Sequence, residues 1–282
     1  MSETSYAPPS LTDAFTGNRL LATFPDDLQQ QVEKSMEVVE LDIGRTVLRR
    51  GTDVGHSLFP FGTAMISMAV DLDDGRSVEV ASIGREGAVG GIISCGHVPA
   101  FTRAEAMVAG PAARVPMRVI EEAKSRSAHL RNLFCRYSDY LLAQIMQTVA
   151  CNSFHPIEAR AARWLLTAQD RAGSRLELTQ ESLAGLLGVQ RTTINAVARE
   201  LQDEGLITTR RGIIEVHDRE GLMRRTCECY DRVERFFSDI VGPKGIGRSC
   251  STIAISICLR AFGSGSRTSS SRARNFRSDF SA

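Results

Sequence analysis

Residues 178–211 read LTQESLAGLLGVQRTTINAVARELQDEGLITTRR and contain two short amphipathic patterns on either side of Gly188. The apolar positions recur at helical spacing, as Leu183, Leu186 and Leu187 in the first pattern and as Ile194, Val197, Ala198 and Leu201 in the second. Thr179 stands where an N-cap of the first helix is expected. Two helices joined by a glycine turn predict a helix-turn-helix, a unit that presents its second helix to the major groove of DNA.

Polar side chains occupy the outer face of the second predicted helix. Arg191, Asn195 and Arg199 are four residues apart, so they line one side of it. Arginine can bond guanine through two hydrogen bonds, and Asn or Gln can do the same to adenine. The alternative is a solvated polar face in a helical module that does not bind DNA. The predicted DNA contacts are Thr179, Gln190, Arg191, Thr192, Thr193, Asn195, Arg199, Arg210 and Arg211.

A β-hairpin is expected directly after this unit, in the sequence GLITTRRGIIEV at 205–216. Gly205 ends the second helix, and two short strands begin at Leu206 and Ile213. The turn between the strands holds Arg210, Arg211 and Gly212, whose charges suit phosphate contacts. The hairpin is therefore predicted to be the wing of a winged helix-turn-helix.

The half of the chain before this unit has a different sequence pattern. From residue 38 to about residue 115, short apolar runs recur between glycines, and the sequence DDGR at 73–76 is a hairpin signal. Many short strands at this spacing predict a jelly roll or a related β-barrel. Before them, Pro25 and the acids that follow it predict the start of a helix with a buried stripe.

A long helix is expected between these two parts. Its apolar positions recur at steps of three and four residues, at Leu130, Leu133, Phe134, Tyr137, Leu141 and Ile145. Such a seam can pair with a second copy of the chain, or it can pack only against the β-domain. We expect a homodimer, because a two-fold DNA reader normally needs a partner subunit.

Five segments follow from these patterns. They are a disordered N-terminus (1–17), a β-roll sensor domain (18–128), a dimerisation helix (129–153), a winged helix-turn-helix (154–239) and an atypical basic, Ser-rich tail (240–282) that we expect to be disordered. The tail carries seven Lys and Arg against one acid, which leaves 27 basic and 32 acidic residues elsewhere. Because acidic residues outnumber basic ones outside the tail, DNA binding must depend on a local basic surface.

The motifs together resemble the Crp/Fnr family of bacterial transcription regulators. The resemblance covers nearly all of residues 19–237, and its most specific segments are Leu178–Leu206 and Asp74–Gly91. It implies an α+β fold with an N-terminal jelly-roll β-barrel similar to cyclic-nucleotide-binding domains, a long dimerisation helix and a C-terminal winged helix-turn-helix. Many members begin the recognition helix with Arg-Glu-Thr, whereas this chain has Thr192 in place of Glu, which predicts a different preferred site.

The resemblance also bears on ligands. In nucleotide-binding members a Gly-Glu segment and an Arg-Ser or Arg-Thr pair hold the ribose and the cyclic phosphate. The corresponding residues here are Gly90-Gly91 and Arg103-Ala104, so the carboxylate and the hydroxyl are missing. These departures argue against a cyclic-nucleotide ligand, and no other cofactor is evident.

The cysteines and histidines predict no metal site. The chain has seven Cys and five His, and we expect reduced thiols. Cys95, Cys135 and Cys151 stand apart and are interpreted as small core residues. Cys227 and Cys229 are predicted to lie in a helix after the wing, where side chains two apart point to different faces. The histidines show no ligand spacing, and no catalytic motif is present.

The sequence therefore predicts a cytoplasmic, non-enzymatic, sequence-specific DNA-binding transcription regulator. It would bind a near-palindromic site as a homodimer and respond to an unidentified signal at the β-roll. Its partners would be double-stranded DNA and a second copy, with RNA polymerase a further candidate and no membrane. The alternative is a ligand-sensing module that acts through protein contacts with little specific DNA binding.

Overall fold

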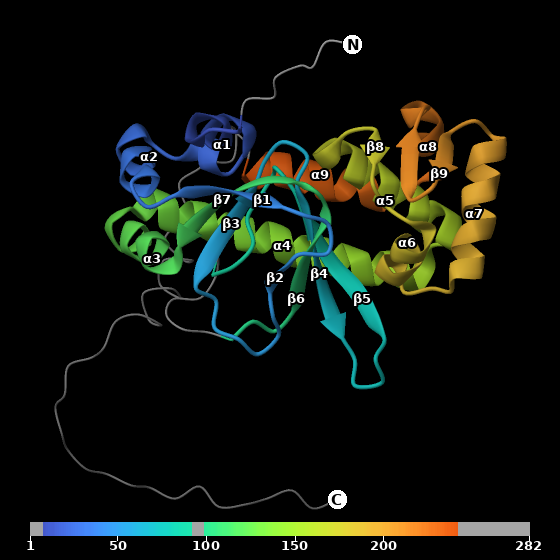
Figure 1. The fold of residues 1–282 in the computed structure, drawn as a ribbon, viewed down its shortest axis with the longest axis horizontal. Helices are drawn as coiled ribbons and strands as arrows, with labels where there is room; N and C mark the ends of the chain where they lie inside the picture. The colour runs from blue at the N-terminus through green and yellow to red at the C-terminus, as the bar shows by residue number, and fades with distance from the viewer. Residues whose placement is uncertain (1–7, 92–98, 242–282) are drawn as a thin grey trace, which may run out of the picture. The chain divides into compact units, whose positions relative to one another are not determined.

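The computed structural model describes residues 8–91 and 99–241 (Figure 1). Cys95, the first seven residues and the predicted tail from residue 242 onward lie outside the described residues. The helices are α1 (Leu11–Gly17), α2 (Asp26–Glu33), α3 (Met117–Arg126), α4 (Ala128–Phe154), α5 (Ile157–Ala172), α6 (Gln180–Leu187), α7 (Arg191–Asp203), α8 (Arg219–Arg225) and α9 (Cys229–Ile240), with a short 3-10 helix, η1, at Leu21–Thr23. Within these residues, no helix is both long and apolar enough to cross a membrane.

Helix α1 corrects the expectation that residues 1–17 are disordered throughout. Ser10 accepts a hydrogen bond from the Asp13 amide, and Asp13 accepts one from the Ser10 amide at 2.8 Å. This reciprocal capping box satisfies amides that would otherwise lack partners at the start of the helix. Ala14 and Phe15 are buried in the core, so this short helix is held by packing as well as by its cap.

Two antiparallel sheets form the β-roll. The strands are β1 (Glu37–Leu41), β2 (Thr46–Leu48), β3 (His56–Pro60), β4 (Met65–Asp71), β5 (Ser77–Ile83), β6 (Arg103–Val108) and β7 (Gly110–Pro116). One sheet has the order β1-β7-β3 and the other the order β2-β6-β4-β5. The predicted hairpin is confirmed, since Asp71 pairs with Ser77 and Gly75 takes a φ of 85° in the turn. Strand β6 alternates buried and half-buried residues, as expected for a strand with one face in the core.

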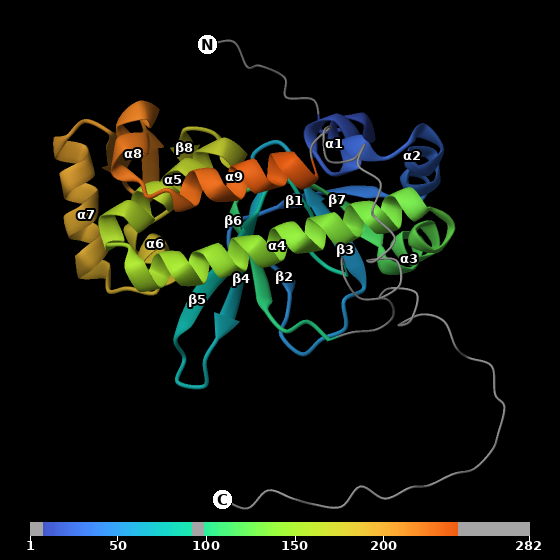
Figure 2. The same cartoon turned by 180° about the vertical axis from the view of Figure 1, so that it is seen from behind.

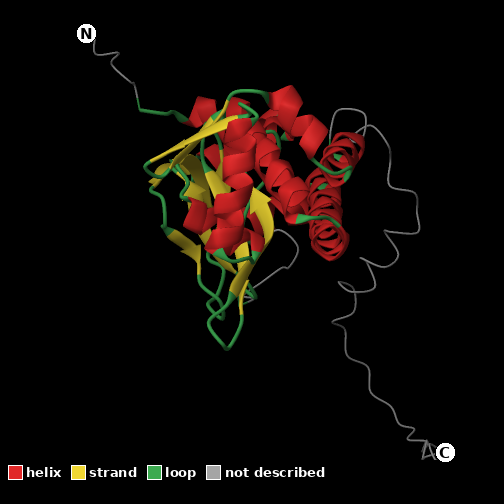
Figure 3. Ribbon diagram, turned by 90° about the vertical axis from the view of Figure 1, so that its right-hand side faces the viewer, coloured by secondary structure: helices red, strands yellow, loops and turns green. Residues whose placement is uncertain are grey.

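Helix α4 runs along most of the described part and lies beside α9 in both views (Figures 1 and 2). Figure 3 shows the strands of the roll gathered to one side of these helices. Tyr137 of α4 is fully buried, where its hydroxyl donates to the Ala88 carbonyl at 3.0 Å and accepts from the Ala88 amide at 2.9 Å. Tyr140, one turn further on, packs edge-on against Phe237 of α9 at 4.9 Å between ring centroids.

The apolar seam predicted on this helix packs against the protein's own body. Leu130, Leu133, Phe134 and Tyr137 are buried, and Leu141 and Ile145 pack against the cores of the roll. The expectation that these residues pair with a second copy is therefore wrong. A different stripe is exposed, comprising Leu142 (53% exposed), Met146 (57%) and Val149 (61%).

The C-terminal module has its own core. Helices α5–α8 surround a three-stranded sheet of order β8-β10-β9, made of β8 (Arg175–Leu176), β9 (Ile207–Arg210) and β10 (Ile213–Val216). Leucines and β-branched residues from all these elements meet around the buried Trp164 of α5. Met65 and Val108 of the roll join the same cluster, so the roll and the module share an apolar contact.

Candidate nucleic-acid interface

Helices α6 and α7 form the predicted helix-turn-helix. Thr179 is the N-cap of α6, and its hydroxyl accepts a hydrogen bond from the Ser182 amide at 2.9 Å. Gly188 ends α6 in the left-handed conformation, with φ 65° and ψ 37°, which costs a non-glycine residue about 1–2 kcal/mol. The turn is closed by a hydrogen bond from the Val189 amide to the Ala184 carbonyl at 3.0 Å. This closure is a glycine C-cap, and it fixes the angle at which α7 leaves α6.

Helix α7 separates its two faces cleanly. Ile194, Val197, Ala198 and Leu201 are buried, as predicted. On the opposite side Arg191, Thr192, Asn195 and Arg199 are exposed, and Thr193 is half-buried. Gln190 is the exposed N-cap residue, although its side chain caps no amide. The structure thus places the predicted base-reading residues on one accessible helix face that begins at a helix N-terminus.

Arg191 has a partner within the motif. Its guanidinium lies 3.6 Å from a carboxylate oxygen of Glu181 on α6, and both side chains are mostly exposed. An exposed ion pair of this kind is worth about 0–1 kcal/mol, so guanine or phosphate can displace it. The ion pair therefore holds the Arg191 guanidinium near the start of α7, but it is weak enough for another ligand to break it.

Strands β9 and β10 form the wing next to this face. Arg211 and Gly212 both take positive φ, of 42° and 85°, which is the pattern of a two-residue type I′ turn. Gln202 of α7 accepts a hydrogen bond from the Thr209 amide at 2.8 Å and so ties the wing to the recognition helix. A Cβ added to Gly212 would lie 3.6 Å from the Thr179 methyl group, so the wing tip lies beside the start of α6.

The residues that correspond to the nucleotide-binding positions of related proteins, Gly90, Gly91, Arg103 and Ala104, are engaged within the roll. Arg103 pairs with Asp71 at 3.2 Å and with Glu105, and hydrogen bonding to Arg103 lowers the pKa of Asp71. Ala104 is fully buried in β6. Gly90 and Gly91 take positive φ, and a Cβ on Gly91 would overlap the Met117 side chain. Arg103 thus has two carboxylate partners with which an incoming anion would compete.

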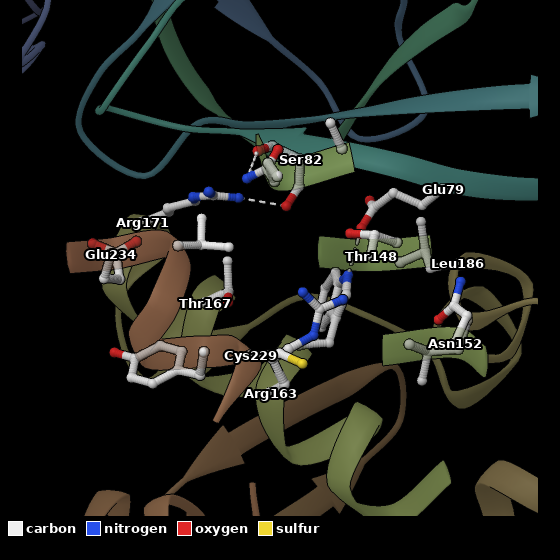
Figure 4. Close-up of a pocket in the computed structure, with 16 residues that line it drawn as sticks. Glu79, Ser82, Thr148, Asn152, Arg163, Thr167, Arg171, Leu186, Cys229 and Glu234 are labelled. Carbon is white, nitrogen blue, oxygen red and sulfur yellow. Dashed lines mark hydrogen bonds between the residues drawn. The ribbon is translucent and has the colours of Figure 1, made fainter. Parts of the chain in front are cut away.

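A buried polar contact joins the roll to the C-terminal module and lines the pocket in Figure 4. Trp164 of α5 donates a hydrogen bond to Glu79 of β5 at 2.9 Å. Further along α5, the Arg171 guanidinium pairs with Glu86 at 3.0 Å and contacts the Ser82 hydroxyl, toward which it points in Figure 4. Arg171 and Glu86 are 4% and 5% exposed, and removing one partner of such a buried pair typically costs about 3–5 kcal/mol. This contact therefore fixes α5 against β5, and no pattern in the sequence predicts it.

The structure contradicts the prediction that Cys151 stands apart from the other cysteines. Its sulfur lies 3.6 Å from that of Cys227, and the Cys229 sulfur lies 3.4 Å from Nδ1 of His155. Cys227 lies between α8 and α9 and is not helical, so the argument from two faces of one helix does not apply to it. Burial raises the pKa of the Cys151 and Cys229 thiols, which is the opposite of what an activated nucleophile requires.

Comparisons with known proteins agree with this architecture. Residues 159–225 match the Crp-like helix-turn-helix domain family. The HTH-type transcriptional regulator Cmr of Mycobacterium tuberculosis (strain CDC 1551 / Oshkosh) is 39% identical over 70 residues, a stretch that spans 25% of this chain and 28% of that regulator's length.

Solved structures are similar over a longer range. FixK2 of Bradyrhizobium japonicum superposes with a TM-score of 0.58 at 14% identity, covering 68% of this chain and 98% of that one. A Crp/Fnr-family transcriptional regulator from Eubacterium rectale gives 0.55 at 18% identity, over 73% and 96%. The c-di-GMP-responsive global regulator CLP of Xanthomonas campestris gives 0.54 at 15% identity, over 69% and 100%. These likenesses establish the fold.

The fold and the exposed face of α7 define a protein with an N-terminal β-roll and a C-terminal winged helix-turn-helix. Residues 159–225 form a Crp-like helix-turn-helix domain, and the described part of the chain has the fold of solved Crp/Fnr-family structures.

Proposed function

We propose that this protein is a homodimeric, sequence-specific DNA-binding regulator that reads a near-palindromic site with two copies of α7. The observation that carries the proposal is the exposed row Arg191, Asn195 and Arg199 on a helix whose opposite face is buried. Arg191 and Asn195 supply donors and acceptors for the edges of guanine and adenine. The positive end of the helix dipole at Arg191 adds attraction for phosphate.

The wing supplies the second part of the interface. Arg210 and Arg211 are exposed at the tip, beside Thr179 at the start of α6. Such contacts set the register of the protein on the duplex without reading sequence. Base reading is therefore assigned to α7 and positioning to the wing and to Thr179.

A homodimer is supported by the exposed apolar stripe of α4. Leu142, Met146 and Val149 recur at i, i+4 and i+7, the spacing of a helix–helix contact. Two copies joined along α4 would place two α7 helices on successive major grooves, with half-sites about 34–36 Å apart. The signal would act on the roll, and we expect the protein to work in the cytoplasm without an enzymatic step.

Selection of binding sites from random double-stranded DNA tests the proposal. The full chain should select two half-sites related by two-fold symmetry. Arg191→Ala should lose about 1–3 kcal/mol, roughly 5- to 150-fold in affinity, and relax the preference at one position of each half-site. Arg126→Ala, on the exposed surface of α3, is the matched control and should leave the selected site unchanged. Failure to select any site, or equal losses in both variants, would overturn the assignment.

A further inference from the structure

Cys151, His155, Cys227 and Cys229 come together where three helices of the described part meet. Their candidate ligand atoms all lie within 4.8 Å of one another. Cys151 is in the last turn of α4 and His155 is the C-cap residue of that helix, whereas Cys227 and Cys229 stand at the junction of α8 and α9. We propose that these four residues form a Cys3His site for a single Zn²⁺ ion.

Two separations between the ligand atoms match those of one tetrahedral ion. Zinc binds sulfur at about 2.3 Å and imidazole nitrogen at about 2.0–2.1 Å, so tetrahedral neighbours lie roughly 3.8 Å apart for two sulfurs and about 3.5 Å apart for sulfur and nitrogen. The observed separations are 3.6 Å between the Cys151 and Cys227 sulfurs and 3.4 Å between the Cys229 sulfur and Nδ1 of His155. Two sulfurs 3.6 Å apart are also well beyond the about 2.05 Å of a disulfide.

The groups around the cluster give an independent reason to assign a metal. Nε2 of His155 lies 3.3 Å from a carboxylate oxygen of Glu228, while Nδ1 faces the sulfurs. A metal-binding histidine usually donates its other N–H to a carboxylate, which fixes the tautomer that leaves the ligating nitrogen unprotonated. The Gln147 amide donates to the Cys229 sulfur at 3.0 Å, a contact that also suits a thiolate.

The ligand chemistry selects zinc among the common metals. Three thiolates and one imidazole are soft and intermediate donors, which Zn²⁺ accepts in structural sites, whereas Mg²⁺ and Ca²⁺ require oxygen ligands. Cys151 and Cys229 are 0% and 1% exposed and Cys227 is 9% exposed, so the site is closed as structural zinc sites are. Binding would release the three thiol protons to solvent and leave a complex of net charge −1, near the side chains of Arg160 and Arg163.

The position of the site defines what the ion would do. It would tie the end of α4, which carries the exposed apolar stripe, to the segment that joins α8 to α9. Ala159 of α5 packs against the same cysteines, and the Arg160 guanidinium donates to the Leu187 carbonyl at 2.6 Å, immediately before the turn of the helix-turn-helix. Zinc would therefore hold the C-terminal module against α4, and the site itself does not depend on DNA binding.

Metal content of the full chain, purified with a thiol reductant, tests the proposal. We expect one zinc ion per chain by atomic emission, and visible absorption bands of tetrahedral cobalt–thiolate coordination when Co²⁺ replaces zinc. Cys151→Ser and Cys227→Ser should lose the ion, whereas Cys135→Ser, at an exposed position on the same helix α4, should retain it. A second control, with Cys95, Cys250 and Cys258 replaced together, should also retain it.

Three variants at Glu228 and His155 keep the test valid if a cysteine variant fails to fold. Glu228→Gln should weaken zinc binding roughly 10- to 100-fold against a chromophoric chelator, because the histidine loses its carboxylate partner. His155→Ala should weaken binding further, and His155→Cys should restore it with four thiolate ligands. Lack of zinc and cobalt binding in the parent, a Cys151–Cys227 disulfide in the reduced preparation, or equal loss of metal in Cys135→Ser would overturn the proposal.

Discussion

At the residue scale, Glu79 is a carboxyl group placed where its charge is costly. It is 9% exposed, and its Oε1 accepts a hydrogen bond from Trp164. Burial raises the pKa of Glu79 above its ordinary value of 4.5, although the Trp164 bond and the charges of Arg171 and Arg163 partly oppose the rise. The folded state consequently holds the Glu79 proton more tightly than the unfolded state does.

This shift predicts a pH dependence of stability. Below pH 4.5, Glu79 is protonated in both states, and the stabilisation that comes from its raised pKa is fully present. As the pH rises through the raised pKa of the folded state, the unfolded state gains from ionisation and that contribution is lost. Glu79→Gln keeps the acceptor for Trp164 and removes the titration. The variant should therefore become more stable than the parent as the pH rises.

Urea unfolding of parent and variant across the acidic to neutral range measures the effect. Glu177→Gln, at an exposed position in the same protein, is the control and should follow the parent at each pH. A constant difference between Glu79→Gln and the parent at all pH values would show that the carboxyl group has no raised pKa.

At the element scale, the wing depends on one residue in an unusual backbone conformation. Arg211 has a φ of 42°, which Asn tolerates better than Arg. Arg211→Asn should therefore keep or slightly raise the stability of the hairpin while removing one charge. DNA affinity should fall for all sequences alike, and the slope of log affinity against log salt should decrease in magnitude by about 1.

Gly212→Ala separates backbone geometry from charge at the same turn. Gly212 has a φ of 85°, so alanine strains the turn without changing the charge. We expect a loss of about 1 kcal/mol in stability and an unchanged salt slope. Salt titrations of DNA binding, together with thermal unfolding, measure both variants. An unchanged salt slope in Arg211→Asn would show that Arg211 of the wing does not contact DNA phosphates.

Elements set by local signals could be predicted from the sequence, whereas contacts between distant residues could not. The helix-turn-helix, the hairpin at 73–76 and the wing follow from local signals, because caps, glycine turns and apolar periods are properties of neighbouring residues. The Cys151–Cys227 contact and the Arg171–Glu86 pair join residues 76 and 85 positions apart. Such contacts arise only when α4, α5, α9 and the roll pack together. No local pattern in the sequence encodes them.

Helix α4 shows a second limit of prediction from the sequence. Its apolar residues cover more than one face, so periodicity alone does not say which stripe faces the roll. The structure shows which stripe faces the roll, because Tyr137 and Leu133 are buried whereas Met146 is 57% exposed. The sequence thus predicted the helix correctly, but the apolar seam that it assigned to a second copy packs against the roll.

At the scale of the whole molecule, the exposed stripe of α4 determines the expected assembly. Leu142, Met146 and Val149 form an apolar strip beside polar surroundings, and such a strip is stabilised by a partner that removes it from water. A two-fold arrangement places the same residue of each copy near the axis. Met146 lies between the other two, so a charge there would meet a like charge from the second copy.

Met146→Glu should therefore convert a dimer to a monomer. Met223→Glu on α8 is the matched control, because it introduces the same charge at a methionine that is also exposed, at 44%. Sedimentation over a range of concentrations should show a dimer for the parent and for the control, and a monomer for Met146→Glu. The monomer should still bind one half-site weakly, since α7 and the wing lie far along the chain from Met146, but it should lose the two-fold site. A parent that sediments as a monomer, or a Met146→Glu variant that remains a dimer, would exclude α4 as the interface and leave the two-fold reading of DNA without its structural basis.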